Sequence, residues 1–214
     1  MLIEEIMKTD LITLGPDDTV KDALQIMRDE RIRHIPIVST DGAVVGIISD
    51  RDLKTNTPTS VNEQDKRHYD LPLSEIMTKD PIIGHPMDFV EEVAVLFYEN
   101  HIGSLPIVSN NQLVGIITET DLLYKYIELT GAHQPGSQIE IRVPNVPGNL
   151  YEVSKVFHEL NTNVLSVLVY PDKEIETNKI LVVRIKTMNP LPIIEGLNKS
   201  GFEVLWPNVP GIDI

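Results

Sequence analysis

One segment of the chain occurs twice. Ile6–Asp10 reads Ile-Met-Lys-Thr-Asp, and Ile76–Asp80 reads Ile-Met-Thr-Lys-Asp. The correspondence continues to the Pro-Ile-Val sequences at Pro36–Val38 and Pro106–Val108, after which one residue is lost in a polar turn. A unit of about 60 residues buries only about 60% of its unfolded surface and is marginally stable alone. The two copies are therefore expected to pack together about a pseudo-twofold axis and to form a cleft, where ligands bind.

Each copy is predicted to fold as strand, helix, strand, strand, helix. Apolar residues within 20–27 recur at helical spacing. Asp18 and Asp88 are expected to be the N-caps of this helix and of its counterpart, and Glu91 is expected to complete a capping box after Asp88. The polar segment from Lys54 to Asp70 is predicted to link the copies. The later strands are predicted at Ile35–Val38 and Val44–Ile48, and at Leu105–Val108 and Leu113–Ile117.

The last predicted strand of each copy leads into a shared pattern. This pattern consists of a glycine, two apolar residues, Ser or Thr, two variable residues and Asp. The pattern stands at Gly46–Asp52 and at Gly115–Asp121. One interpretation is structural, because Ser-x-x-Asp and Thr-x-x-Asp also match a capping box at a helix start. The other is ligand binding, since a helix start offers free N–H groups to a phosphate and a carboxylate accepts hydrogen bonds from two adjacent ribose hydroxyls. The two interpretations are compatible.

With these signatures both copies resemble CBS domains, whose pairs form Bateman modules, and the resemblance covers about residues 1 to 130. It implies that Asp52 and Asp121 hold ribose and that Ser49 and Thr118 lie near phosphate. The implied ligand is AMP, ADP, ATP or a related adenosyl compound, acting as an effector and not as a catalytic cofactor.

Basic residues of the first copy are candidates for a phosphate clamp. Arg33 and His34 precede the Ile35 strand, and Arg51 lies within the first signature. They are either a solvated basic group or ligands of phosphate, the latter because this edge faces the cleft in CBS domains. The second copy has neutral residues at the matching positions, so its site is expected to favour AMP, adenosine or an adenosyl compound. Strand residues beside the cleft complete the predicted site: Ile35, Pro36, Leu105 and Pro106.

The composition excludes several functions. The formal net charge of −14 repels nucleic-acid phosphates and anionic lipid, so neither nucleic acid nor membrane is expected as a partner. The absence of Cys excludes disulfides and zinc–thiolate sites. The N-terminus lacks the basic and apolar regions of a signal peptide, so a cytoplasmic location is expected. No His pair has metal-ligand spacing, and no nucleophile–base pair or Gly-rich phosphate loop stands out. No metal site and no enzymatic activity are therefore expected.

The last third of the chain has a different pattern. Its predicted order is strand, helix, strand, strand, helix, strand, which is the ferredoxin-like arrangement. With Pro-Gly-Asn-Leu opening its first helix, this segment resembles an ACT domain. Asn145, Gly148, Asn149 and Leu150 are its candidate effector loop. The fold class expected for the whole chain is mixed α+β and α/β, with CBS domains at 1–70 and 71–130 and an ACT-like domain at 138–214.

Two CBS repeats followed by an ACT-like domain resemble the acetoin utilization protein B family. The resemblance implies a regulator of acetoin or butanediol catabolism and of sporulation. The expected partners are an adenine nucleotide, a second copy of the chain in a homodimer, and an unknown target protein. Two alternatives stay open: a partner-binding module with unoccupied clefts, and an amino-acid-responsive regulator acting through the ACT-like domain.

Overall fold

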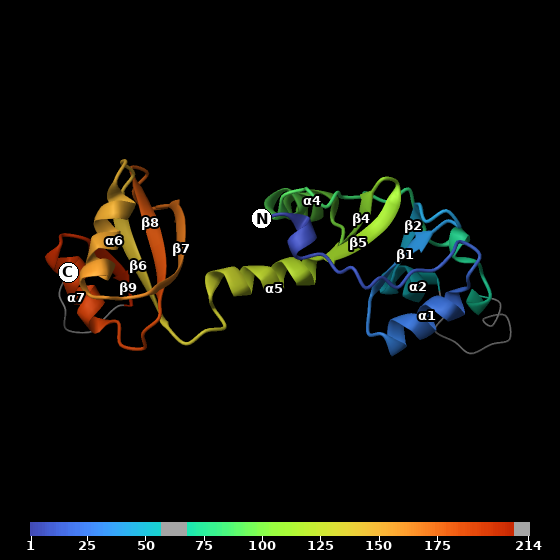
Figure 1. The fold of residues 1–214 in the computed structure, drawn as a ribbon, viewed down its shortest axis with the longest axis horizontal. Coiled ribbons are helices and arrows are strands. Elements are labelled where there is room, and N and C mark those ends of the chain that lie inside the picture. Colours follow the sequence, from blue (N-terminus) through green and yellow to red (C-terminus); the bar gives the residue numbers. More distant parts are fainter. Residues whose placement is uncertain (57–67, 208–214) are drawn as a thin grey trace. The chain divides into compact units, whose positions relative to one another are not determined.

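The structure, a computed structural model, describes residues 1–56 and 68–207. The chain divides into two compact units, Met1–Leu123 and Tyr124–Ile214, and each is described by itself (Figure 1). Most of the predicted linker from Lys54 to Asp70 lies outside the described residues. Among the helices described, none is long and apolar enough to span a membrane.

The first unit contains both repeats, and each has the predicted helix, two strands and helix. The two strands of each repeat pair antiparallel in matching register, with Ile35 opposite Ile48 and Leu105 opposite Ile117. The strand predicted to open each repeat is reduced to isolated bridges at Leu14 and Gly84 and to the two-residue β3 (Thr78–Lys79). The elements are α1 (Val20–Asp29), β1 (His34–Val38), β2 (Val44–Ser49) and α2 (Asp50–Asn56), then α4 (Val90–Asn100), β4 (Ser104–Ser109), β5 (Gln112–Thr118) and α5 (Glu119–Thr130).

The segment that opens each repeat packs on the other repeat. Ile3, in η1 (Ile3–Glu5), is fully buried in the core of the second repeat. Leu73, in η2 (Leu73–Glu75), is fully buried in the core of the first. Main-chain pairing follows the same exchange, because Lys8 forms a bridge with Ile116 of β5 and Thr78 of β3 pairs with Ile47 of β2. Each core is therefore completed by the opening segment of the other repeat.

The glycine of each signature lies at this exchanged contact. A Cβ added at Gly46 would overlap the sulphur of Met77, and a Cβ at Gly115 would overlap that of Met7. Both methionines pack against the core of the repeat that they contact. The strand needs glycine at these positions because a methionine from the other repeat fills the space of a side chain.

The prediction that Asp18 is the N-cap of α1 is wrong. Thr19 is the cap: its Oγ1 accepts from the N–H of Asp22 at 3.3 Å, and its own N–H donates to Asp22 Oδ2 at 3.0 Å. Asp18 instead accepts from the N–H of Gly15 at 2.6 Å, which closes the turn before the helix. The helix begins one residue later than expected because the Asp18 carboxylate is engaged in that turn.

The second repeat shows the same displacement. The Asp88 carboxylate accepts from the N–H of His85 at 2.7 Å, in the turn before α4. The N–H of Phe89 donates to Glu92 at 3.4 Å, so Glu92 and not Glu91 reaches back at the helix start. The predicted capping box between Asp88 and Glu91 is therefore wrong by one residue.

The second unit has the predicted order of six elements. One antiparallel sheet runs in the order β7-β8-β6-β9. Residues of the strands and of both helices share one hydrophobic core. The elements are β6 (Ser137–Pro144), α6 (Asn149–Glu159), β7 (Val164–Pro171), β8 (Asn178–Ile185), α7 (Leu191–Lys199) and β9 (Glu203–Trp206).

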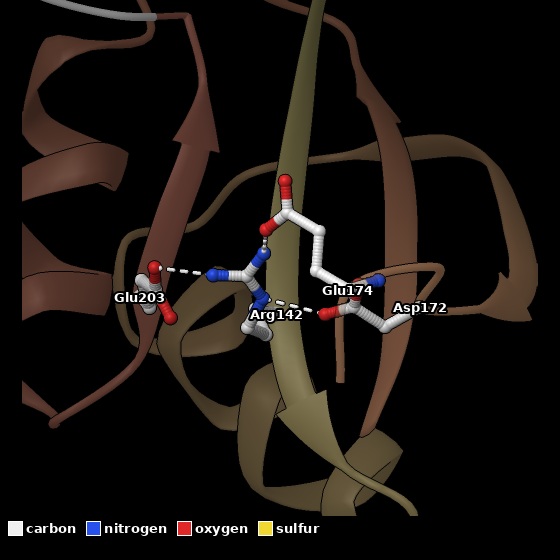
Figure 2. Close-up of polar contacts among 4 residues, drawn as sticks. All are labelled: Arg142, Asp172, Glu174 and Glu203. Atoms are coloured by element: carbon white, nitrogen blue, oxygen red, sulfur yellow. Dashed lines mark hydrogen bonds and ion pairs between the residues drawn. The ribbon is translucent and has the colours of Figure 1, made fainter. Parts of the chain in front are cut away.

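Arg142 links β6 to the β7–β8 connection and to β9 through charged side chains (Figure 2). Its guanidinium donates to Asp172 at 2.6 Å, to Glu174 at 2.6 Å and to Glu203 of β9 at 2.8 Å. Asp172 is buried, yet the N–H of Glu174 and the Arg142 guanidinium hold its pKa below the ordinary value. The cluster joins the β7–β8 connection and the edge strand β9 to the centre of the sheet.

Substituting the signature glycines tests the exchanged packing. Gly46→Ala and Gly115→Ala should each lower the free energy of unfolding by about 1–3 kcal/mol, because the new methyl group overpacks the methionine contact. Chemical denaturation followed by circular dichroism measures the change. Gly15→Ala is the control, since its Cβ would meet only Asp18 Oδ2 at 3.6 Å. Equal stabilities of all three variants would contradict the packing explanation.

Candidate functional site

A cavity of about 1080 Å³ lies in the first unit, and both repeats line it. This volume suits a nucleotide-sized ligand. The first signature forms part of the wall, and the exchanged segment around β3 forms another part. The wall includes Arg33, His34, Ser49, Arg51 and Asp52 from the first repeat, Thr78, Asp80 and Ile82 from the exchanged segment, and Tyr98, His101, Gly103, Ser104, Glu119 and Thr120 from the second repeat.

The first signature forms a complete capping box at the start of α2. The main-chain N–H and the hydroxyl of Ser49 donate to Asp52 Oδ2 at 2.8 and 2.6 Å. The N–H of Asp52 donates back to the Ser49 hydroxyl at 3.2 Å. Because both residues also line the cavity, the cap orients the Asp52 carboxylate at the cavity wall. The structural interpretation of this motif is confirmed, and it leaves the ligand-binding interpretation open.

The second signature repeats this geometry at the start of α5 and adds a cation. The N–H and hydroxyl of Thr118 donate to Asp121 Oδ2 at 2.9 and 2.6 Å. Lys8 Nζ lies 2.9 Å from Asp121 Oδ1. Burial raises the pKa of Asp121, but the hydrogen bonds from Thr118 and Lys8 outweigh it and hold the pKa below the ordinary value of an aspartate. Glu119 and Thr120 of this signature line the cavity, whereas Thr118 and Asp121 are not among the described residues that line it.

Arg33 and His34 lie against the second repeat. Arg33 Nη2 donates to the hydroxyl of Thr120 at 3.4 Å. A Cβ added at Gly103 would lie 3.3 Å from His34 Nε2. Burial and the charge of Arg33 lower the pKa of His34, against opposing contributions from Asp52, Glu119 and Asp50. These groups of the first copy therefore lie at the junction of the repeats, within reach of the second signature as well as the first.

Four predicted residues are buried in the strands that support the site. Ile35 and Leu105 are fully buried in the two cores, and Pro36 and Pro106 are buried beside them. None of the four is among the described residues that line the cavity. They share β1 and β4 with His34 and Ser104, which do line the cavity.

The candidate effector loop of the second unit is an exposed turn. Gly148 has φ +94°, and a Cβ there would meet nothing within 4 Å, so its conformation and not crowding accounts for the glycine. The Asn149 side chain donates to the carbonyl of Pro144, and the N–H of Asn145 donates to Thr177 at 2.8 Å. Leu150 is 53% exposed. The polar groups of this loop thus hold the turn that opens α6.

The sequence reasoning missed residues that the exchange brings to the signatures. Lys8 reaches Asp121, whereas Thr78 and Asp80 line the cavity with Asp52. The sequence did single these residues out, because they belong to the repeated Ile-Met-x-x-Asp motif. Within the described residues, no group of three or more His, Cys, Asp or Glu side chains could hold a metal ion.

The family model of the CBS domain matches residues 3–56 and 73–128. The chain belongs to the CBS-domain family. Its matched residues contain both signatures and both exchanged segments. The tandem CBS pair expected from the sequence is therefore confirmed, and the arrangement is consistent with a Bateman module.

Three similar proteins extend this comparison. A Vibrio cholerae protein assigned to acetoin utilization (AcuB) is 32% identical, over 63% of this chain and 96% of that one, with a TM-score of 0.55. The CBS domain pair of protein MJ0100, solved with 5′-methylthioadenosine and S-adenosyl-L-methionine, is 26% identical, over 63% of this chain and 98% of that one, with a TM-score of 0.52. Inosine-5′-monophosphate dehydrogenase of Methanocaldococcus jannaschii is 36% identical over 56% of this chain, but the match spans only 22% of that enzyme.

His34 should make the protein less stable in mild acid. The pKa of His34 lies below its ordinary value in the folded state. Between the folded and unfolded pKa values the unfolded chain therefore binds more protons, so the stability declines as the pH falls through that window. The free energy of unfolding of the wild type should therefore decline relative to that of His34→Asn as the pH falls from about 7 to about 5. Denaturant titrations at several pH values measure this difference. Parallel pH profiles of the wild type and His34→Asn would contradict the lowered pKa of His34.

Proposed function

We propose that the first unit is a non-enzymatic sensor of adenosine-containing ligands, which bind beside Asp52. The observation that carries this proposal is the Asp52 carboxylate, oriented by Ser49 at the wall of a cavity of about 1080 Å³. The complex of the similar MJ0100 domain pair with two adenosyl compounds supports this ligand class.

The cavity wall offers groups for each part of such a ligand. A carboxylate accepts hydrogen bonds from adjacent hydroxyls, which assigns the ribose to Asp52. Ile47 and Ile82 present apolar surface of the kind a purine base covers. Arg33 and Arg51 line the same cavity and supply positive charge for a phosphate or carboxylate group. Burial and the charge of Arg33 lower the pKa of His34, and an anion bound beside it would oppose that shift.

We propose that this sensor regulates acetoin catabolism. The likeness to the Vibrio cholerae protein supports this proposal.

The second unit is proposed to be an ACT-like domain, because its six elements and sheet order have the split βαβ arrangement. An amino-acid effector at its exposed turn is the second candidate function. Isothermal calorimetry with an amino-acid panel tests that candidate, and Gly148→Ala should reduce any heat it detects.

Adenosine ligands should raise the melting temperature of the full chain. A ligand at about 100 times its Kd adds about 2.7 kcal/mol to the free energy of unfolding. AMP, ADP, ATP, S-adenosyl-L-methionine and 5′-methylthioadenosine are the probes, and GMP is the control ligand. The absence of any shift at millimolar concentrations would contradict nucleotide sensing and favour a partner-binding module.

Asp52→Ala should weaken binding at the first signature by roughly ten- to a hundredfold, because hydrogen bonds to a charged group are lost. Asp22→Ala is the matched control: Asp22 forms the same box with Thr19, at 2.6 and 3.0 Å, on a helix whose cap does not line the cavity. Both variants should lose about 0.5–2 kcal/mol of stability through the cap. Calorimetry showing that they lose affinity equally would assign Asp52 a structural role alone.

The homodimer and the cytoplasmic location expected from the sequence stay predictions. A C₂ dimer is the commonest assembly of soluble proteins. Light scattering of the full chain at micromolar concentration measures the mass directly, and a mass of a single chain would contradict the dimer.

A further inference from the structure

The surface of the second repeat is far more apolar than that of the first. Among residues 1–56 no large hydrophobic side chain is exposed. Between residues 68 and 123 the exposed large hydrophobic residues are Tyr69, Ile82, Ile83, Met87, Phe89, Val95, Tyr98 and Leu123. The fold does not require this difference, because both repeats are built from the same elements. The apolar surface of the second repeat therefore points to a contact outside the single chain.

Helices α1 and α4 show the difference along one matching line of positions (Figure 1). Residues spaced by four and then three positions lie on the same side of a helix. On α1 the exposed residues at this spacing, here called the α1 stripe, are Lys21, Gln25 and Arg28. On α4 the matching exposed residues, here called the α4 stripe, are Glu91, Val95 and Tyr98. Polar side chains of the first repeat are thus replaced by Val95, which is 51% exposed, and Tyr98, which is 81% exposed.

The charges of the two helices are complementary. The α4 helix contains Glu91, Glu92 and Glu99 and no Lys or Arg, so two α4 helices in contact would oppose carboxylates only. The α1 helix contains cations as well as acids, and its cations, Lys21 and Arg28, lie on the α1 stripe. The aliphatic stem of an arginine covers apolar surface, and its guanidinium packs favourably on a tyrosine ring. The α4 stripe is therefore better matched by an α1 stripe than by a copy of itself.

The two stripes belong to helices that border one side of the unit. Tyr98 of the α4 stripe lines the cavity together with Lys54 of α2, and α2 packs against α1. A twofold axis therefore allows two chains to pair unlike stripes in two identical contacts and leaves no stripe uncovered. We propose that the α4 stripe docks on the α1 stripe of a second copy, so that the first repeat of each chain faces the second repeat of the other. This arrangement assigns an interface and an orientation to the expected homodimer, and it does not depend on ligand binding.

Thiol cross-linking tests the orientation directly, because the chain contains no Cys. Gln25→Cys and Val95→Cys place one thiol at the centre of each stripe, at positions that do not line the cavity. After subunit exchange, a mixture of the two full-length variants treated with a short bismaleimide should give a covalent dimer. Each variant alone should give none. Asn110→Cys, an exposed position in the turn between β4 and β5, is the control and should link to neither.

Charge reversal tests the complementarity of the stripes. Lys21→Glu combined with Arg28→Glu should raise the Kd of the dimer at least roughly tenfold in sedimentation equilibrium, because carboxylates then face carboxylates. Val95→Gln, which installs the residue of the matching position, should also weaken the dimer. Lys79→Glu combined with Lys199→Glu changes the net charge by the same amount at exposed positions outside both stripes, and should leave the Kd unchanged. Circular dichroism checks that each variant is folded.

The outcomes separate this dimer from the proposed function. Cross-linking of Gln25→Cys alone or of Val95→Cys alone would show that a stripe meets its own copy, which would overturn the pairing of unlike stripes. A wild type with the mass of a single chain, or a dimer whose mixed variants do not cross-link, would overturn the interface. Ligand sensing would stand in each case, since a melting-temperature shift with AMP is measured separately. Absence of that shift in a chain that cross-links as expected would overturn ligand sensing and leave the dimer standing.

Discussion

The exchange of opening segments between the repeats is the contact on which the rest of the first unit depends. Ile3 and Leu73 each complete the core of the other repeat, and Met7 and Met77 fill the space above the signature glycines. A repeat of this size cannot bury enough apolar surface alone. The exchange solves this problem, and the same contact brings polar residues of one repeat to the signature of the other.

Each signature combines a structural and a chemical feature in one short sequence. Glycine admits the methionine, the hydroxyl residue caps the next helix, and Asp closes the capping box. A carboxylate held this way has a fixed direction, so less conformational entropy is lost when it binds a ligand. Asp22 forms the same box in α1 without lining the cavity, which shows that the cap alone does not make a site.

Charge distinguishes the two halves of a nearly symmetric unit. Arg33 and His34 of the first repeat lie against Thr120 and Gly103 of the second. Lys8 crosses in the same direction, to Asp121. The net charge of −14 therefore conceals a local group of basic side chains that the tertiary structure assembles at the junction of the repeats. An anionic ligand gains from such a group although the protein as a whole repels anions.

The sequence by itself determined the two repeats, the order helix, strand, strand, helix within each, the capping boxes of both signatures and the order of elements in the second unit. These features depend on local spacing, on periodicity and on internal repetition, which are visible in one chain. Only the tertiary structure decided that Asp18 closes a turn and does not cap α1. It alone placed Lys8 beside Asp121 and Arg33 beside Thr120. The physical reason is that burial of Ile3 and Leu73 in the opposite cores, a contact between residues distant in sequence, sets which side chains meet at each signature.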